Sequence, residues 1–286
     1  MNSRLISLDF FRGLTIAAMI VVNDPGSWSY VYPPLRHADW HGVTPTDLVF
    51  PFFLFIVGVS IVLALSKRNK TDTSIYFKII KRTIIIFSIG LFLALFPSFD
   101  FENLRIAGVL QRIALVYLFC SVIYLNSSFL VQIWIGIILL LLYWVFMTKV
   151  PFDNVLAGTL EPGNNFAAWV DQFITPGRMY QKTWDPEGFF STIPAIATGL
   201  SGMFCGHILL NKSKDLKDKI ILIFVAGFSA MCFGMLWDYS FPMNKHIWTS
   251  SYVLFSSGIA MLFLATCIWV IDLKKKTKPF HFGIVF

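Results

Sequence analysis

The sequence predicts an all-α fold, a polytopic transmembrane helical bundle with eight complete spans and the start of a ninth. Hydrophobic residues make up 56% of its 286 residues and charged residues only 14%, whereas soluble domains carry about 25% charged residues. Several apolar runs reach ~20 residues, the length that a helix needs to cross the hydrocarbon core. A transmembrane β-barrel is excluded, because its strands alternate in segments of about 10 residues.

The apolar runs follow one another along the whole chain, so we treat residues 1–286 as one domain. The first run is a retained span rather than a signal peptide, because it lacks a small-residue cleavage site and is interrupted by Asp9 and Arg12. Residues 148–187, rich in Pro, Gly, Asn and acidic residues, are predicted to form a long loop. The predicted spans are Ile6–Val22, Asp47–Leu65, Ile79–Phe96, Ile106–Leu125, Phe129–Met147, Phe189–Leu210, Ile220–Trp237 and Tyr252–Ile271.

The last residues, PFHFGIVF, begin another apolar run that stops at residue 286. This run is too short to cross a membrane. We therefore expect the sequence to be cut inside a ninth span, with further C-terminal spans missing.

The distribution of basic residues predicts how the chain is oriented across the membrane. They gather in the second–third connection, in the sixth–seventh connection and after the eighth span, and cytoplasmic loops carry such an excess. These connections and the N-terminus are therefore predicted to be cytoplasmic, and the connection that holds His37 extracytoplasmic. The same loops explain the net charge of +7, which does not imply nucleic acid. The basic residues are Lys67, Arg68, Lys70, Lys78, Lys81, Arg82, Lys212, Lys214, Lys217, Lys219, Lys274, Lys275, Lys276 and Lys278.

The connection Asn23–Asp47 is the best candidate for chemistry. It is long, aromatic and stiffened by four prolines, which indicates a loop of definite shape rather than a short linker. His37 is its leading residue, because histidine alone changes charge near neutral pH without a special environment. The alternative is a loop histidine bonded only to backbone. His37 and His41 have a metal-ligand spacing if helical, but the flanking prolines and glycine leave at most a short turn, so no metal is predicted.

Residues 44–47, Thr-Pro-Thr-Asp, predict a helix start with Thr44 as the N-cap and Asp47 at the third position. Asp47 is then a capping carboxylate. It also lies beside the His37 loop, so a second role as the orienting partner of the histidine stays open. The four cysteines lie in apolar runs without paired spacing, so no disulfide framework is predicted.

Other charged residues lie in or next to the predicted spans. Asp9 and Arg12 share one helix face, as an interfacial ion pair or as a buried pair lining a polar cavity. Arg112 lies about two turns into the fourth span, where it is costly unless it lines a cavity or pairs with a carboxylate. Asp185 and Glu187 precede the sixth span and either cap it or contact a cationic or hydroxylated substrate.

Seven stretches also carry a family likeness. They are LDFFRG, the VN of Val22 and Asn23, RHADWHG, TDLVFPFFLFIVG, GVLQRIALVY, DPEGFFSTI and MNKHIWTSSYVL, and in this order they resemble the transmembrane acyltransferases typified by heparan-α-glucosaminide N-acetyltransferase. The resemblance covers essentially the whole chain. It implies transfer of an acetyl group from cytoplasmic acetyl-CoA, as co-substrate, to a sugar amine on the other side of the membrane.

The resemblance also implies site residues. The family's active-site histidine lies in a lysine-His-Ala-x-Trp-x-Gly context, which matches His37 with Arg36 in place of the lysine. The family's catalytic asparagine after the first span matches Asn23. His41 stands where the lysosomal enzyme has asparagine and receives no catalytic role. The large luminal N-terminal region and the last spans of the lysosomal enzyme have no counterpart in these 286 residues, which again leads us to expect a truncated chain.

We therefore expect a sugar N- or O-acetyltransferase of a bacterial inner membrane. His37 deprotonates the acceptor or carries the acetyl group, and Asn23 donates a hydrogen bond to the developing oxyanion. Arg12 and Arg112 are expected partners for CoA phosphates or a buried carboxylate. The expected partners are membrane lipid, an extracytoplasmic sugar or glycan acceptor and acetyl-CoA; a homodimer stays open. The main alternative is a transporter or flippase for a polar lipid or sugar, which intramembrane charges suit equally; a membrane scaffold is a third class.

Overall fold

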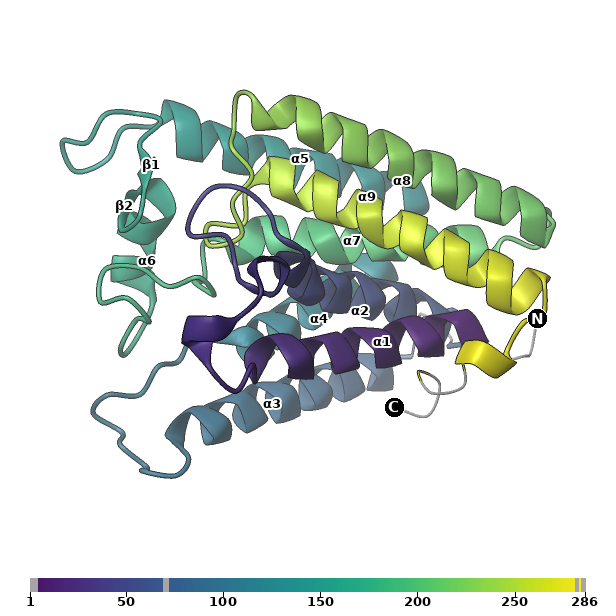
Figure 1. Ribbon diagram of the computed structural model, residues 1–286, viewed down its shortest axis with the longest axis horizontal. Coiled ribbons are helices and arrows are strands. Elements are labelled where there is room, and N and C mark those ends of the chain that lie inside the picture. Colours follow the sequence, from purple (N-terminus) through teal and green to yellow (C-terminus); the bar gives the residue numbers. More distant parts are fainter. Residues whose placement is uncertain (1–4, 69–71, 281–282, 284–286) are drawn as a thin grey trace.

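The computed structural model describes residues 5–68, 72–280 and 283. In this part of the chain, eight long helices run side by side along the long axis of the molecule (Figure 1). They are α1 (Ile6–Asn23), α2 (Val49–Leu65), α3 (Ser74–Leu95), α4 (Val109–Asn126), α5 (Phe129–Lys149), α7 (Thr192–Leu210), α8 (Leu216–Asp238) and α9 (Ser250–Cys267).

The two ends of the bundle differ. The long connections, residues 24–48, 96–108, 150–191 and 239–249, gather at one end, on the left in Figure 1, which we call the loop-bearing end. The short connections, residues 66–68 with 72–73, 127–128 and 211–215, lie at the other, which we call the lysine-rich end because of Lys67, Lys212 and Lys214. The predicted alternation of long and lysine-rich connections is therefore a feature of the structure.

Seven of the described helices are long and apolar enough to cross a membrane, so the all-α transmembrane prediction is confirmed and the span count differs by one. The exception is α3, predicted as the third span. Every stretch of 18 residues within it contains three charged residues, Lys78, Lys81 and Arg82, whereas each of the seven candidate spans has a stretch of that length with at most two. Helix α3 nevertheless packs along α4 as a member of the bundle.

The connection between α5 and α7 is not the plain loop that its composition predicts. It holds a two-stranded antiparallel ribbon, β1 (Leu160–Glu161) with β2 (Asn164–Asn165), and a short helix, α6 (Phe166–Ile174). The side chain of Asn165 accepts the backbone N–H of Ala168 at 2.9 Å and so caps α6. The ring of Phe166 stacks on that of Phe146 of α5, with centroids 5.5 Å apart, which holds this segment over the loop-bearing end.

Helix α2 lies at the centre of the bundle, in contact with α1, α4, α7 and α9. Its close packing on α7 depends on glycine: a Cβ at Gly58 would lie 1.9 Å from the carbonyl oxygen of Gly199, and one at Gly202 would lie 2.0 Å from that of Phe55. Small residues allow helices in membranes to approach in this way. The central position of α2 places its N-terminal turn, residues 44–48, in the middle of the loop-bearing end.

Helix α9 continues as a π-helical turn, Ile268–Leu273, and a 3₁₀ turn follows at Lys278–Phe280. The predicted start of a ninth span falls largely on residues 281–286, and of these only Gly283 is among the residues that the structure describes. Gly283 lies against Phe10 of α1.

Candidate active site

His37 and Asp47 form the centre of the site. Nδ1 of His37 lies 2.6 Å from Oδ1 of Asp47. A carboxylate can only accept hydrogen bonds, so this contact requires the proton of the neutral imidazole on Nδ1 and leaves Nε2 as the unprotonated, accepting nitrogen of the ring. The His37 side chain is 36% exposed and the Asp47 side chain 1%. The pair therefore has a buried carboxylate and an accessible imidazole.

Asp47 is held by the turn that begins the α2 segment. Thr44 and Asp47 form a capping box at the 3₁₀ turn Pro45–Leu48. Oδ2 of Asp47 accepts the backbone N–H of Thr44 at 3.0 Å and of Ala38 at 3.1 Å, while Oδ1 faces His37. The structure thus gives this carboxylate both contacts that the sequence left open, the cap and the histidine.

Lys245 is the third member of the cluster. Its Nζ lies 3.0 Å from Nδ1 and 3.4 Å from Nε2 of His37, and 3.6 Å from Oδ1 of Asp47. Burial lowers the pKa of Lys245 from its usual value, while the charge of Asp47 opposes that shift. Lys245 was not predicted as a site residue. The available signal was a lysine next to a histidine, in MNKHIW, within a connection of the end that has few basic residues.

The α8–α9 connection brings Lys245 to the site because it packs on the His37 loop and forms hydrogen bonds with it. The backbone N–H of Gly42 donates to the carbonyl oxygen of Met243 at 2.8 Å, and Nε2 of His246 lies 3.3 Å from the carbonyl oxygen of Ala38. The ring of Trp40 stacks on His246, with centroids 5.3 Å apart and planes 7° from parallel. Contacts across some 200 residues of sequence thus give the loop the definite shape that its prolines predicted.

His41 differs from His37 in its surroundings. Its Nδ1 lies 3.4 Å from Nδ2 of Asn244 in the α8–α9 connection, and it does not line the cavity at His37. Within the described residues, no group of three or more His, Cys, Asp or Glu side chains could hold a metal ion, and the four cysteines are free thiols.

His37 opens onto a cavity of about 180 Å³, which we call the His37 cavity. Its polar lining consists of Asn23, His37, Thr46, Glu187 and Lys245. The remaining wall is mostly apolar and comes from α1, α2 and α4, with Phe53 among its residues. Both residues for which the family resemblance implied catalysis, Asn23 and His37, therefore border one space.

Asp185 and Glu187 bind an arginine that the sequence analysis did not single out. Arg105 donates to both carboxylate oxygens of Asp185, at 2.6 and 2.7 Å, and also pairs with Glu187. Burial alone would lower the pKa of Arg105, but these two carboxylates raise it above its usual value. Asp185 is fully buried, whereas Glu187 is 11% exposed and reaches the His37 cavity. Of the two acids, only Glu187 lies where a ligand of that cavity could meet it.

Arg112 lines neither the His37 cavity nor the cavity at Arg12. It is 1% exposed, donates to the carbonyl oxygen of Gly188 at 2.9 Å and to the hydroxyl of Ser191, and stacks over Trp248 at 5.0 Å. Its Nε and Nη1 have no hydrogen-bond partner among the described residues. The geometry thus ties Arg112 to the start of α7 rather than to a carboxylate of a span.

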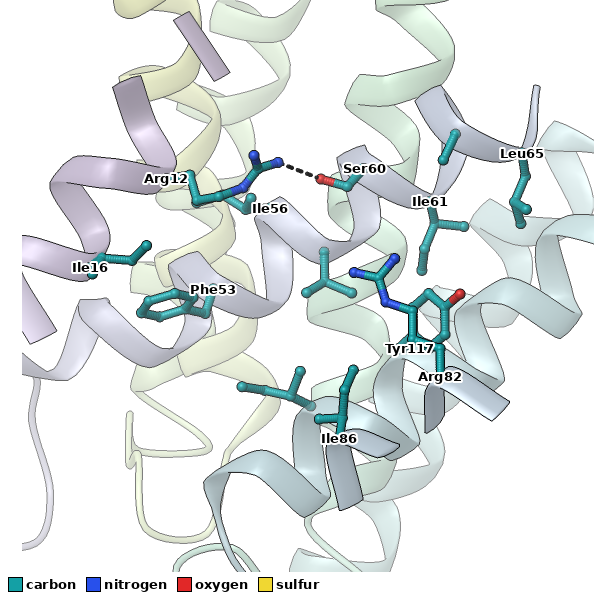
Figure 2. A pocket seen from close by; sticks show the side chains of 13 residues that line it. Arg12, Ile16, Phe53, Ile56, Ser60, Ile61, Leu65, Arg82, Ile86 and Tyr117 are labelled. Atoms are coloured by element: carbon teal, nitrogen blue, oxygen red, sulfur yellow. Dashed lines mark hydrogen bonds between the residues drawn. The ribbon is translucent and has the colours of Figure 1, made fainter. Parts of the chain in front are cut away.

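A second cavity, of about 550 Å³, lies among α1, α2, α3 and α4, and we call it the arginine cavity. Figure 2 shows the guanidinium groups of Arg12 and Arg82 directed into it. Arg12 pairs with Asp9 at 3.1 Å and donates to Ser60 at 3.2 Å, and Arg82 stacks over Tyr117 at 5.0 Å. The Asp9–Arg12 ion pair therefore exists and its arginine borders a cavity, but the Arg12 side chain is 41% exposed, so the pair is not buried.

Comparison with known proteins shows the family of the chain. Residues 4–230 match the family model described as heparan-alpha-glucosaminide N-acetyltransferase, catalytic. The chain is 28% identical to the heparan-alpha-glucosaminide N-acetyltransferases of Homo sapiens and Mus musculus, in each case over 95% of its own length, and these alignments cover 49% and 50% of the relatives. The chain thus spans about half the length of the curated relatives it matches. Because the family model matches most of its residues, this transmembrane chain belongs to the heparan-alpha-glucosaminide N-acetyltransferase catalytic family.

Proposed function

We propose that this protein is a membrane-embedded acetyltransferase. It moves an acetyl group from cytoplasmic acetyl-CoA to an amino or hydroxyl group of an extracytoplasmic sugar or glycan. The observation that carries the proposal is the His37–Asp47 pair, 2.6 Å apart, at the mouth of a cavity in a membrane bundle of this family. The orientation is supported by the positive charge of the lysine-rich end, which is typical of the cytoplasmic side.

In the proposed reaction His37 takes a proton from the acceptor. With Nδ1–H donated to Asp47, the unprotonated Nε2 accepts the proton of the sugar amine or hydroxyl while that group attacks the thioester carbonyl carbon. The C–S bond then breaks, and the leaving CoA sulfur takes up the proton that Nε2 holds. Such general-base assistance is worth roughly 10²–10⁴-fold in rate. Attack by Nε2 itself uses the same geometry: the C–S bond breaks, CoA leaves as the thiolate, and the acceptor then takes the acetyl group as the C–N bond of the acetyl-imidazole breaks and the acceptor proton passes to the thiolate.

Asn23 and Lys245 are suited to stabilise the negative charge that develops on the thioester oxygen. The thioester oxygen becomes negative when the acceptor adds to the carbonyl, and hydrogen-bond donors placed in advance stabilise that charge. Both side chains line the His37 cavity, and Lys245 lies within 3.6 Å of both His37 and Asp47. We assign them to the oxyanion, and Glu187, on the same cavity, to the acceptor.

The arginine cavity is the proposed site for part of CoA. Its volume of about 550 Å³ lies in the usual range for small-molecule sites, roughly 300–1,000 Å³. Arg12 and Arg82 both face it, and guanidinium groups recognise phosphate through paired N–H donors. We expect these two arginines, rather than the enclosed Arg112, to meet the CoA phosphates. We place the protein in a bacterial inner membrane, in contact with lipid.

The test uses membranes that contain the protein, acetyl-CoA with a labelled acetyl group, and two acceptors, glucosamine and the envelope glycans. We expect His37→Ala to abolish transfer, and His41→Ala, whose imidazole contacts Asn244 instead, to cost much less. Acid-quenched mass spectrometry with acetyl-CoA alone separates the routes, since an acetyl-imidazole route predicts acetyl on His37 and direct attack predicts none.

The competing function is a transporter or flippase, which the two cavities between the same helices favour. It predicts that labelled sugar crosses the membrane without being acetylated. Full transfer activity in both histidine variants would show that the His37 loop is structural and that the chemistry lies elsewhere.

A further inference from the structure

The His37 cavity and the arginine cavity meet at a single side chain. Among the described residues, Phe53 of α2 is the one that lines both. It is half-buried, and Figure 2 shows its ring on the same side of the arginine cavity as Ile16. A residue shared in this way is a wall between two spaces, and its removal would join them.

The two cavities follow one another along the same helix faces, and Phe53 separates them. On α1, Arg12 and Ile16 line the arginine cavity, and Met19 and Val22 line the His37 cavity. These positions are three or four residues apart, so they lie on one face of the helix. One helix face therefore passes from the arginines to the histidine loop.

Helix α4 repeats the pattern. Val109 lines the His37 cavity, and Ile113 and Tyr117, at steps of four residues, line the arginine cavity. Helix α2, between them, carries Phe53 at the crossing point. Helices α1, α2 and α4 thus each border both cavities, and Phe53 lies between the cavities.

The volumes indicate what can lie on each side. About 550 Å³ is enough for a sizeable part of a cofactor, whereas about 180 Å³ is well below the roughly 300–1,000 Å³ of ordinary ligand sites. The smaller space also contains the reacting groups of His37 and Lys245 and must admit the acceptor. Beside the acceptor, the smaller space has room for only a short acyl group.

We infer that the Phe53 ring is a partition between the arginine cavity and the His37 cavity and restricts the donor to short acyl groups. The inference rests on the proposed function. The thioester end of the donor passes the Phe53 ring to reach His37, and the ring closes the space behind a two-carbon acyl group. Each additional methylene then meets a wall, and a missing or added methylene in an apolar pocket is worth roughly 10–200-fold in discrimination.

The experiment compares acetyl-, propionyl- and butyryl-CoA as donors, with transfer to glucosamine and to the envelope glycans as readouts. In the wild type we expect kcat/KM to fall by about tenfold or more for each added methylene. In Phe53→Ala we expect the fall to shrink by at least about tenfold, because the cavities merge. Phe52→Ala is the matched control: Phe52 is the next residue on α2, packs against Phe11 and Phe263, and lines neither cavity. The same profile in all three proteins would overturn the inference.

A second readout does not depend on acyl transfer. A cysteine replaces Met19, which lines the His37 cavity only, and a charged, impermeant thiol reagent is applied to the lysine-rich side of sealed vesicles. Adding Phe53→Ala should raise its modification rate about tenfold or more, and adding Phe52→Ala should not. If the wild type transfers no acyl group, the proposed function fails, yet this rate still decides whether Phe53 is a partition. Equal rates in both double variants would overturn the partition even in an active enzyme.

Discussion

Replacing Asp47 by asparagine should reverse the tautomer of His37 with little change of shape. Oδ2 of Asp47 accepts two backbone N–H groups, from Thr44 at 3.0 Å and from Ala38 at 3.1 Å. An asparagine must keep its carbonyl oxygen there, because an amide NH₂ would direct its hydrogens at two donors. Its NH₂ group then takes the place of Oδ1, 2.6 Å from Nδ1 of His37, and donates to that nitrogen.

The magnitude follows from this exchange. Once Nδ1 accepts a hydrogen bond, the proton of the neutral imidazole moves to Nε2, which can no longer take a proton from the acceptor or attack the thioester. The loss should equal the worth of general-base catalysis, roughly 10²–10⁴-fold in kcat. Substrate binding should change much less, because Asp47 is 1% exposed and does not line the His37 cavity.

The assay is the rate of labelled acetyl transfer in membranes at matched protein levels, with Thr44→Val as the control. That variant removes the hydroxyl that lies 3.0 Å from Oδ2 of Asp47 and with it a cap worth about 1 kcal/mol of stability. It leaves the carboxylate facing His37, so we expect it to keep most of its activity. If Asp47→Asn retains more than about a tenth of the rate, or if both variants lose equal activity, the tautomer argument is wrong.

Further predictions concern stability, pH and orientation. Arg105→Leu leaves the buried Asp185 carboxylate without its cation and should lower the free energy of unfolding by about 3–5 kcal/mol, nearer the lower figure because Arg105 is 27% exposed; an unchanged denaturation midpoint in detergent would contradict this. Burial raises the pKa of Asp171 to about 6, so the folded state binds this proton more readily than the unfolded state, and stability should fall as pH rises from about 4 through about 6, by up to about 3 kcal/mol. Asp171→Asn should lack this component of the thermal midpoint, and parallel pH curves for the two proteins would refute the assignment. A cysteine at the exposed Ser29 should react with an impermeant thiol reagent from outside the cell and one at the exposed Ser213 should not; reversed labelling would invert the orientation.

The helices of the bundle were predictable because long apolar runs are a local signal. The run predicted as Phe129–Met147 is helical over Phe129–Lys149, and the run predicted as Ile6–Val22 over Ile6–Asn23. The miss at α6 (Phe166–Ile174) has a physical reason. Nine residues are too few to span a membrane, and the segment becomes a helix by packing on α5, a contact that composition does not report.

The site divides in the same way between local and distant contacts. His37 and Asp47 are 10 residues apart in one connection, where the helix-start pattern already pointed to the carboxylate. Lys245 is 208 residues from His37, and Arg105 is 80 residues from Asp185. Periodicity and spacing rules describe neighbours within one element, so they could not place these two cations beside the acids that they contact.

The start of α2 also explains why an alanine at Asp47 would be a poor test of mechanism. One carboxylate oxygen is engaged by the backbone N–H groups of Ala38 and Thr44, and the other faces His37 and Lys245. Alanine would remove the cap of the α2 segment and the partner of the histidine together, so lost activity would not distinguish unfolding of the loop from loss of the base. Asparagine keeps the acceptor that the backbone needs and changes the group that faces His37 and Lys245, which is why that substitution separates the capping role of Asp47 from its contacts in the site.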